Sequence, residues 1–434
     1  SKADEKVRNM NISYQYLRPE KAKALRKWVT DPVEVRNEPA VLALENAVIY
    51  PLRRGFGLLF GKGGVLDEKG NYVPESGIPG RVEGTYPLEN VEYRDEKVVY
   101  CGYLVNHWGH FLIEGVTRLW YFLENDPTVD KYVYFVDENE EREIKGNFRR
   151  FLELLGIWDR LEILSKPVCY RQVLIPELGI HMRSAYTPKL LKVFETVAEN
   201  ITVNPDWKAD EKIYFSRSRL KKAGFFECGG DLLDDFFAKN GYTLLYPETL
   251  PLDEMIFRIR GAKIAASLSG SLPHNMLFAK NGQTLEIVER LVLNIDNQVD
   301  VNRIRDLNVT YIDAHYPIYP VDFTGPIVMG CTPELTRFTE DRGYQPPDGK
   351  YLTDKYKKQC FVHYMKAYSD LYRYNWFEED WYAPFAASLY EGFRAGHAFF
   401  GEYLDGKRPF RWHHYLEFHY WKQFVKKLLI RNSN

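Results

Sequence analysis

Two histidines and a glutamate lie close together in residues 106–115, which read NHWGHFLIEG. The segment follows VVYCGYLV, an apolar run that predicts a buried strand, and its own spacing predicts a helix over residues 108–125. His110 and Glu114 are four residues apart, so they share one face near the start of that helix. A carboxylate that an imidazole orients beside a cleft serves as a general base. The alternative is structural, with Asn106 as the helix cap and Glu114 as a surface residue.

The same segment allows a metal site as a second interpretation. His107, His110 and Glu114 share a face at spacings i, i+3 and i+7, which suits a metal-dependent hydrolase or phosphotransferase. The HExxH spacing of zinc proteases is different, and no third histidine motif completes a ligand set. We therefore expect no metal at these residues.

A basic cluster follows a predicted strand in YFSRSRLKK, which contains Arg217, Arg219, Lys221 and Lys222. Four cations on one short loop repel each other unless an anion joins them. Because arginine binds phosphate oxygens in a bidentate way, the predicted partner is a diphosphate. A solvated basic turn is the alternative.

A glycine turn in SLSGSLPHNMLF is the third candidate. Gly270 and Ser271 lie between a predicted strand and a predicted helix, so backbone N–H groups and the positive end of the helix dipole can face a phosphate. Asn275 is available for hydrogen bonding in the first turns of that helix. An ordinary turn is the alternative, but this turn belongs to the same half of the chain as the basic cluster.

Strand and helix patterns alternate along two stretches of the chain, which predicts an α/β fold with parallel sheets. A polar helix is expected at residues 20–29, and the polar segment 199–212 reads as a linker between two units. We expect two Rossmann-like domains, residues 1–205 and 206–325, that face each other across a cleft. Residues 326–434 are rich in aromatics and predict a helical extension that packs back on the first domain.

The composition is that of a globular protein. The 434 residues include 45% hydrophobic and 27% charged residues, and the net charge of −2 gives no reason to expect a nucleic-acid partner. The five cysteines contain no CxxC pair, so we expect a reducing compartment rather than a disulfide framework. With neither a signal peptide nor a bilayer-length apolar run, the expected location is cytoplasmic. The basic, amphipathic segment WKQFVKKLLIR predicts either peripheral contact with the inner face of the plasma membrane or docking on the protein itself.

Taken in order, these motifs resemble glycosyltransferase family 61, which includes bacterial capsular polysaccharide transferases of the DUF563 type. The resemblance covers about residues 40–290 and rests on NHWGHFLIEGVTRLW, YFSRSR with the glutamate of GFFE, LPLDEMIFRIRGAKIAA, GSLPHNMLF and TLEIVE. It implies an inverting, metal-independent transfer from a nucleotide sugar, a UDP-sugar, to a glycan or glycolipid acceptor. It also implies a GT-B arrangement, in which the second domain binds the donor. The oligomeric state stays open.

The resemblance assigns roles to individual residues. His110 and Glu114 match the GH…E/D pattern of the family, with Glu114 as the base. On the donor side, the chain has no DxD motif, so the charge of the leaving diphosphate falls to cations and the helix dipole. The matching donor residues are Arg217 and Asn275, with Arg219, Lys222, Gly270 and Ser271 beside them; Glu286 either binds a ribose or holds the fold. On the acceptor side, the residues expected to lie near the substrate are Asn106, His107 and Trp108.

The chain departs from the family pattern in two places. Ser269 stands where many bacterial members carry a histidine, and Lys221 and Lys222 stand for the usual arginine pair. Donor specificity or phosphate geometry is expected to differ accordingly. A non-catalytic glycan-binding subunit is the remaining alternative, and it predicts no affinity for nucleotides.

Overall fold

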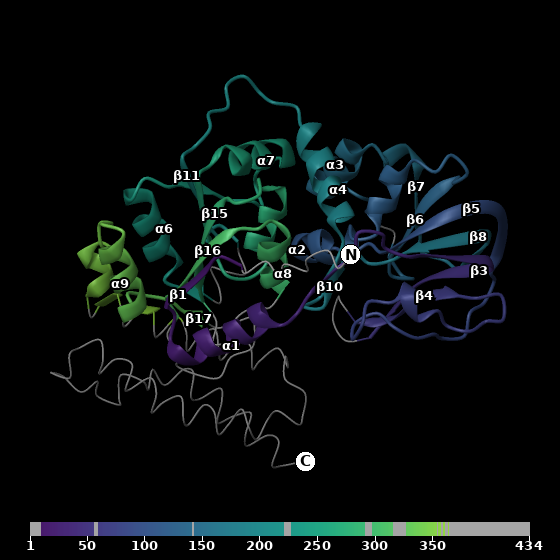
Figure 1. Ribbon diagram of the computed structural model, residues 1–434, viewed down its shortest axis with the longest axis horizontal. Coiled ribbons are helices and arrows are strands. Elements are labelled where there is room, and N and C mark those ends of the chain that lie inside the picture. Colours follow the sequence, from purple (N-terminus) through teal and green to yellow (C-terminus); the bar gives the residue numbers. More distant parts are fainter. Residues whose placement is uncertain are drawn as a thin grey trace, which may run out of the picture.

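The structure is a computed structural model in which two six-stranded β-sheets lie side by side with helices between and around them (Figure 1). It describes residues 10–55, 60–140, 143–220, 227–290, 297–315 and 327–353, together with residues 355, 356, 359, 360 and 363. The described residues also form a three-stranded sheet of β2 (Glu34–Val35), β10 (Ala185–Tyr186) and β9 (Ile180–His181), and a two-stranded sheet of β12 (Glu227–Cys228) and β17 (Ile327–Val328).

The first sheet is mixed. One part of the sheet is parallel and comprises β8 (Val168–Pro176), β5 (Glu92–Tyr103), β6 (Lys131–Phe135) and β7 (Leu161–Leu164). Strand β3 (Val41–Arg54) runs antiparallel to both of its neighbours, β8 and β4 (Gly61–Leu66). The parallel part agrees with the predicted strand–helix alternation, and the antiparallel hairpin is an addition to the expected Rossmann-like pattern. The strands in spatial order are β4, β3, β8, β5, β6 and β7.

The second sheet is parallel throughout, as expected for a Rossmann-like domain. The first strand after the linker, β11, pairs with β13 on one side and β14 on the other, so the strand order reverses between β11 and β14. Such a reversal is the point at which open α/β sheets bind ligands. The strands in spatial order are β1 (Ile12–Tyr16), β16 (Asn308–Asp313), β15 (Thr284–Glu289), β14 (Ile264–Leu268), β11 (Lys212–Phe215) and β13 (Thr243–Leu245).

Helices cover both faces of the second sheet. One face packs α6 (Gly230–Lys239) and α9 (Pro333–Asp341) around Tyr214 and Phe237, whose rings stack at 4.1 Å. The other face packs α7 (Leu252–Gly261), the 3-10 helix η5 (Leu272–Phe278) and α8 (Asn297–Ile304).

The N-terminal segment joins the second sheet rather than the first. The predicted polar helix is present as α1 (Pro19–Thr30), but β1 before it pairs in parallel with β16. The predicted first domain, residues 1–205, was therefore wrong in including β1, which belongs to the second sheet. The cause is a long-range contact that local patterns do not encode: Lys21 of α1 donates to the buried Asp313 at 2.9 Å.

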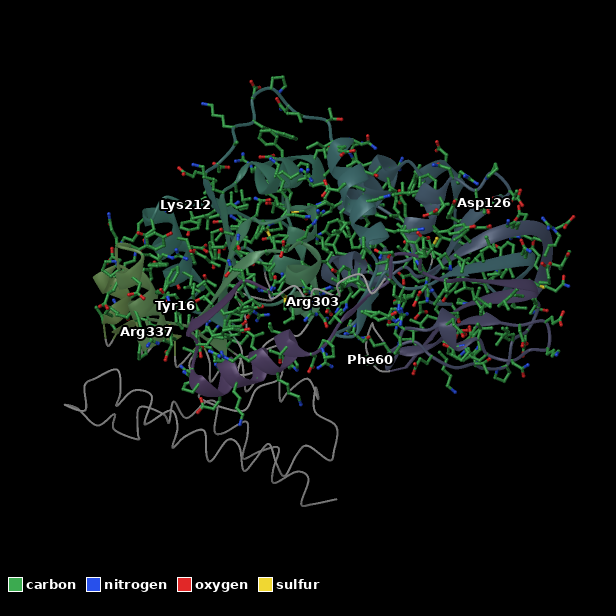
Figure 2. All side chains as sticks on the ribbon, viewed as in Figure 1. Tyr16, Phe60, Asp126, Lys212, Arg303 and Arg337 are labelled. Atoms are coloured by element: carbon green, nitrogen blue, oxygen red, sulfur yellow. The ribbon has the colours of Figure 1, made fainter. Side chains whose placement is uncertain are left out.

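The part of the C-terminal extension that the structure describes also packs on the second sheet. Phe338 of α9 contacts Tyr16 of β1 edge to face, with 5.2 Å between ring centroids, and Figure 2 shows Tyr16 and Arg337 at the same end of the molecule. This differs from the expected packing on the first domain. The aromatic segments beyond residue 363 and the basic tail WKQFVKKLLIR lie outside the described residues.

A shared core joins the two sheets. Helices α3 (Gly146–Leu155) and α4 (Pro188–Glu199) lie between them, and Phe151 and Phe194 both contact Phe278 of η5. The segment predicted to be a linker is irregular and arches from α4 to β11 (Figure 1). Among the described residues, no helix combines the length and apolar character needed to cross a bilayer.

The Lys21–Asp313 pair predicts how strongly the N-terminal segment is held. Asp313 is fully buried, so Lys21→Met leaves its carboxylate with the backbone N–H of His315, at 3.2 Å, and the more distant cation of Arg18, at 3.5 Å. We expect the free energy of unfolding to fall by about 2–3 kcal/mol, because a buried charge loses its main partner. The measurement is urea denaturation, with Lys23→Met, at an exposed position of the same helix, as the matched control. Equal midpoints for the two variants would contradict the assignment of this segment to the second sheet.

Candidate functional site

The predicted helix after β5 is broken into three short pieces. One turn of α2 (Trp108–His110) continues into a π-helical turn, η2 (Phe111–Gly115), and then a 3-10 helix, η3 (Leu119–Glu124). The hydroxyl of Thr117 donates to the carbonyl of Glu114, and Tyr134 donates to that of Gly115 at 2.6 Å. These donors occupy carbonyls that a continuous α-helix would use. Irregular turns of this kind are frequent at functional sites.

The turn at α2 packs directly against η5 of the second half. Gly109 leaves no room for a side chain, since an added Cβ would lie 2.4 Å from the Cβ of Ser271. Beside this contact, the indole Nε1 of Trp108 donates to Asn275 Oδ1 at 2.8 Å, and Asn275 Nδ2 donates to the carbonyl of Leu272. The predicted acceptor-side and donor-side motifs therefore meet. Both polar atoms of the fully buried Asn275 are used inside the fold, which favours a structural role over the predicted donor contact.

Glu114 is buried and paired with an arginine that sequence reasoning missed. The guanidinium of Arg81 forms an ion pair with Glu114 Oε1, and its Nη1 lies 2.8 Å from His110 Nδ1. His110 Nδ1 also lies 3.0 Å from Glu114 Oε2, and it serves either as donor to Glu114 or as acceptor from Arg81, depending on the tautomer. The alternative in which Glu114 is a surface residue is wrong, because its side chain is only 6% exposed.

The metal interpretation of this segment finds no support in the geometry. No three His, Cys, Asp or Glu side chains among the described residues form a set that could hold a metal ion. The ring of His107 packs against that of His110, with 4.9 Å between centroids, while Arg81 takes the carboxylate of Glu114. Asn106 and His107 are both exposed beside α2.

A third histidine, His274 of η5, lies close to this group. Its Nδ1 donates to Gln298 Oε1 at 2.8 Å, Gln298 Nε2 donates to Asn302 Oδ1, and Asn302 Nδ2 donates to the hydroxyl of Tyr311. This buried relay fixes the tautomer and leaves Nε2 without a proton. Burial lowers the pKa of His274 to about 4, and the neighbouring imidazoles of α2 add to this effect. His274 is therefore neutral at pH 7.

On the second half, two arginines share one carboxylate. Glu227 Oε1 accepts from Arg217 Nε at 3.2 Å and from Arg290 Nη1 at 3.0 Å, so one positive charge has no counter-ion in this group. Burial lowers the pKa of Arg290 to about 10, which still leaves it protonated at pH 7. Arg290 Nε also donates to the carbonyl of Ser269 at 2.6 Å. The predicted glycine turn therefore lies against the arginine pair.

Gly270 is required at this contact. An added Cβ would lie 2.9 Å from Nη2 of Arg290, and the φ of +125° disfavours any other residue. The loop that carries Arg217 is held by Asp234 of α6, which accepts from Ser216 and Ser218, each at 2.6 Å. The sequence SRS thus places an arginine between two anchored serines.

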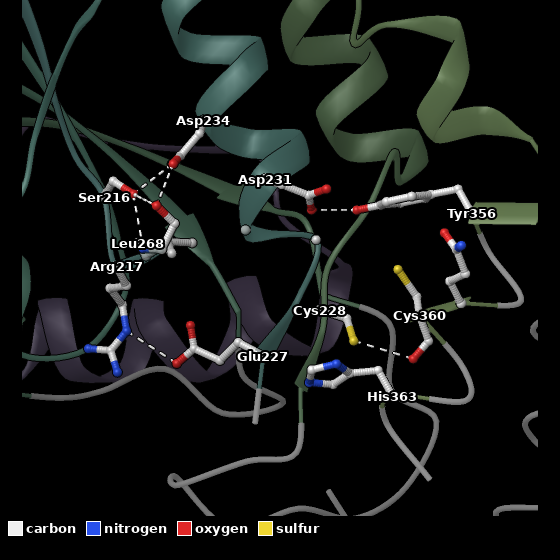
Figure 3. A pocket seen from close by; sticks show the side chains of 14 residues that line it. Ser216, Arg217, Glu227, Cys228, Asp231, Asp234, Leu268, Tyr356, Cys360 and His363 are labelled. Atoms are coloured by element: carbon white, nitrogen blue, oxygen red, sulfur yellow. Dashed lines mark hydrogen bonds and ion pairs between the residues drawn. The ribbon is translucent and has the colours of Figure 1, made fainter. Parts of the chain in front are cut away.

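A cavity of about 310 Å³ opens beside this loop (Figure 3). Ser216, directly after β11, and Leu268, at the end of β14, line it, so the cavity lies where the strand order reverses. Arg217 and Glu227 form part of its wall, and Figure 3 shows their ion pair at one side.

The sequence was also compared with known protein families. Residues 108–285 match the model of the family described as Glycosyltransferase 61. The chain carries a glycosyltransferase family 61 domain. The resemblance noted in the sequence is therefore confirmed, and the protein is a glycosyltransferase, which binds a sugar donor and a glycan acceptor. A search of curated proteins found no match.

The glycosyltransferase domain includes Glu114, Arg217 and Gly270 but ends before Arg290, and Arg81 precedes it. Both missed arginines lie far in sequence from their partners, so local motifs do not reveal them. The available signal for Arg290 was its position directly after a predicted strand, the same position that drew attention to the Arg217 loop.

Four residues that the sequence analysis placed on the donor side lie elsewhere or outside the described residues. The guanidinium of Arg219 packs over the ring of Tyr246, 3.7 Å from its centroid, and does not join the Arg217 group. Lys221 and Lys222 fall outside the described residues. Glu286 lies three residues, or about 10 Å, before the carboxyl end of β15. It is fully buried and accepts from Tyr242 at 2.6 Å, so its position favours holding the fold over binding a ribose.

The relay at His274 predicts a pH dependence of stability. Because the folded pKa of about 4 lies below the ordinary value of 6.5, the unfolded chain takes up this proton first, and stability falls as the pH drops from about 6.5 to 4. We expect the wild type to lose about 2 kcal/mol more than His274→Gln between pH 7 and pH 5.

Urea denaturation at the two pH values measures this difference. Glu289→Gln serves as a control of opposite sign, because burial raises the pKa of Glu289 to about 7 and its contribution to stability is lost as the pH rises from 4.5 to 7. Parallel pH profiles for the wild type and His274→Gln would show that the histidine is not held neutral.

Proposed function

We propose that this glycosyltransferase transfers a sugar from a nucleotide donor, a UDP-sugar, to a hydroxyl of a glycan or glycolipid, with inversion and without a metal ion. One observation carries the proposal: an unbroken line of contacts joins a positive group to a buried carboxylate. Arg217 and Arg290 share Glu227, and Arg290 lies against Gly270. Next to Gly270, Ser271 contacts Gly109, which precedes His110 in the turn that leads to Glu114.

The charges at the two ends of this line suit the two halves of the reaction. Glu114 Oε2 accepts the proton of the acceptor hydroxyl, and His110 orients the carboxylate. The acceptor oxygen then bonds to the anomeric carbon while the bond from that carbon to the diphosphate oxygen breaks on the opposite side. The electron pair leaves with the diphosphate, and the guanidiniums of Arg217 and Arg290 stabilise its charge. Arg81 holds the other oxygen of Glu114, which keeps Oε2 as the atom that acts.

The proposed arrangement is of the GT-B type. The second sheet supplies the arginine pair and the Gly270 turn for the donor, while the first supplies Glu114, with Trp108 and His107 beside it on the acceptor side. The neutral His274 lies between them and adds no positive charge that would compete for the carboxylate. A role in bacterial surface polysaccharide synthesis, on the cytoplasmic side of the plasma membrane, is the setting that we propose for this reaction.

The proposed base predicts a specific loss of turnover. Glu114→Gln keeps the size of the side chain but removes its ability to accept a proton, so kcat is expected to fall by about 100-fold or more. Affinity for UDP should change by less than about twofold, because the side chain does not face the diphosphate in the proposed mechanism. Glu340→Gln, at an exposed position of α9, is the matched control. Sugar-nucleotide consumption in the presence of EDTA measures kcat, and wild-type turnover by Glu114→Gln would remove this residue from the role.

The proposed diphosphate site predicts a loss of nucleotide binding. Arg217→Ala removes a charged donor, and we expect the Kd for UDP to rise by about 10- to 100-fold, as measured by calorimetry. Arg337→Ala is the matched control, since Arg337 is exposed on α9 and Figure 2 shows it at one end of the molecule. Unchanged UDP affinity in Arg217→Ala would contradict the site.

A further inference from the structure

We propose that the cavity between the carboxyl ends of β11 and β14 binds the nucleoside half of the donor, with the ribose 2′-hydroxyl donating to Asp231. The inference rests on the proposed function and adds the direction in which the donor lies. The volume of the cavity, about 310 Å³, lies at the lower end of the range for small-molecule sites, about 300–1,000 Å³.

The lining of the cavity suits a neutral ligand that donates hydrogen bonds. The carboxylates of Asp231 and Asp234 line the cavity without a cation partner among its lining residues, since the guanidinium of Arg217 pairs with Glu227. Such a surplus of negative charge repels phosphate but accepts hydroxyl and amide hydrogens. The side chains of Leu268, Tyr356 and Cys360 supply apolar surface for a base.

Among these side chains, Asp231 has a carboxylate oxygen that is available to accept a hydrogen bond from a ligand. Both oxygens of Asp234 accept from serines, and Glu227 holds the two arginines. Asp231 Oδ1 accepts from the hydroxyl of Tyr356 at 2.6 Å, whereas Oδ2 accepts no hydrogen bond from the described part of the chain. Asp231 is also exposed at the start of α6, within the wall of the cavity (Figure 3).

The order of the groups decides which end of the donor enters the cavity. Arg217 belongs both to the cavity wall and to the arginine pair, so a ligand that leaves the cavity passes directly to Arg290 and Gly270. Beyond Gly270 the line of contacts leads to Glu114. The transferred sugar must lie at the Glu114 end, and the diphosphate must lie at the arginines. The nucleoside is the part that remains for the cavity.

The opposite placement, with the diphosphate in the cavity against the start of α6, meets the wrong charge. Asp231 lies in the first turn of α6, where it already complements the positive end of the helix dipole. A diphosphate there would face Asp231 and Asp234 with only Arg217 in compensation.

Gly230 offers a way to fill the cavity with little effect on the fold. It lines the cavity, and no atom lies within 4 Å of a Cβ added to it. We expect Gly230→Phe to weaken UDP binding by about tenfold or more, while binding of inorganic pyrophosphate stays within about twofold of the wild type. Gly230→Ala is the matched control and is expected to bind both ligands normally. Calorimetry on the full chain measures the affinities, and circular dichroism checks that each variant is folded.

A second variant tests the ribose contact without filling space. Asp231→Asn is expected to weaken UDP binding by about tenfold, through the loss of a charged acceptor, and to leave the affinity for 2′-deoxy-UDP nearly unchanged. Equal losses for UDP and 2′-deoxy-UDP would overturn the ribose assignment.

The outcomes separate this inference from the proposed function. If Gly230→Phe keeps wild-type affinity for UDP, or loses UDP and pyrophosphate together, the nucleoside does not occupy the cavity, while the proposed transfer reaction still stands. If the wild-type protein binds no nucleotide diphosphate at all, the inference and the proposed function both fail.

Discussion

The contact between Gly109 and Ser271 is the constraint on which the site depends. At this position the backbone of the first half touches the second half without an intervening side chain, and the hydrogen bond from Trp108 to Asn275 lies beside it. A larger residue at 109 would have to move the two halves apart, because protein interiors are close-packed and do not absorb such an overlap. The distance between the carboxylate on one half and the arginines on the other is therefore set by packing, through contacts that involve no charge.

Charge is arranged differently on the two sides of this contact. On the first half, Glu114 and Arg81 compensate each other, and His274 of η5, which approaches this group from the second half, is neutral. On the second half, Arg217 and Arg290 have one carboxylate between them. A buried positive charge without a full complement of counter-ions is costly, so an anionic ligand at this place would lower the free energy of the folded protein. The side that lacks an anion is the side for which we propose nucleotide binding.

The local features of the molecule could be predicted from the sequence, and the long-range ones could not. The strand after the linker, its SRS loop and the glycine turn follow from patterns within about ten residues, and the structure brings these motifs together. The proximity of Glu114 to His110 could be predicted for the same reason, since it follows from the helical spacing of four residues. By contrast, Arg81 lies 33 residues before Glu114 and Arg290 lies 63 residues after Glu227. Asn275 and Glu286 were chosen by motif, and only their hydrogen-bond partners favour a role in the fold.

The place of β1 has a consequence for how the chain reaches its native state. This strand lies far ahead of its partner β16 in the chain, and hydrogen bonds at its start join residues 297 positions apart. Until the ribosome has delivered β16, the earlier strand has no edge to join, and its polar backbone must remain hydrated or be protected. Assembly of the second sheet is thus a late event with high contact order, and folding of this enzyme is expected to be completed after the first sheet has formed rather than from the N-terminus onward.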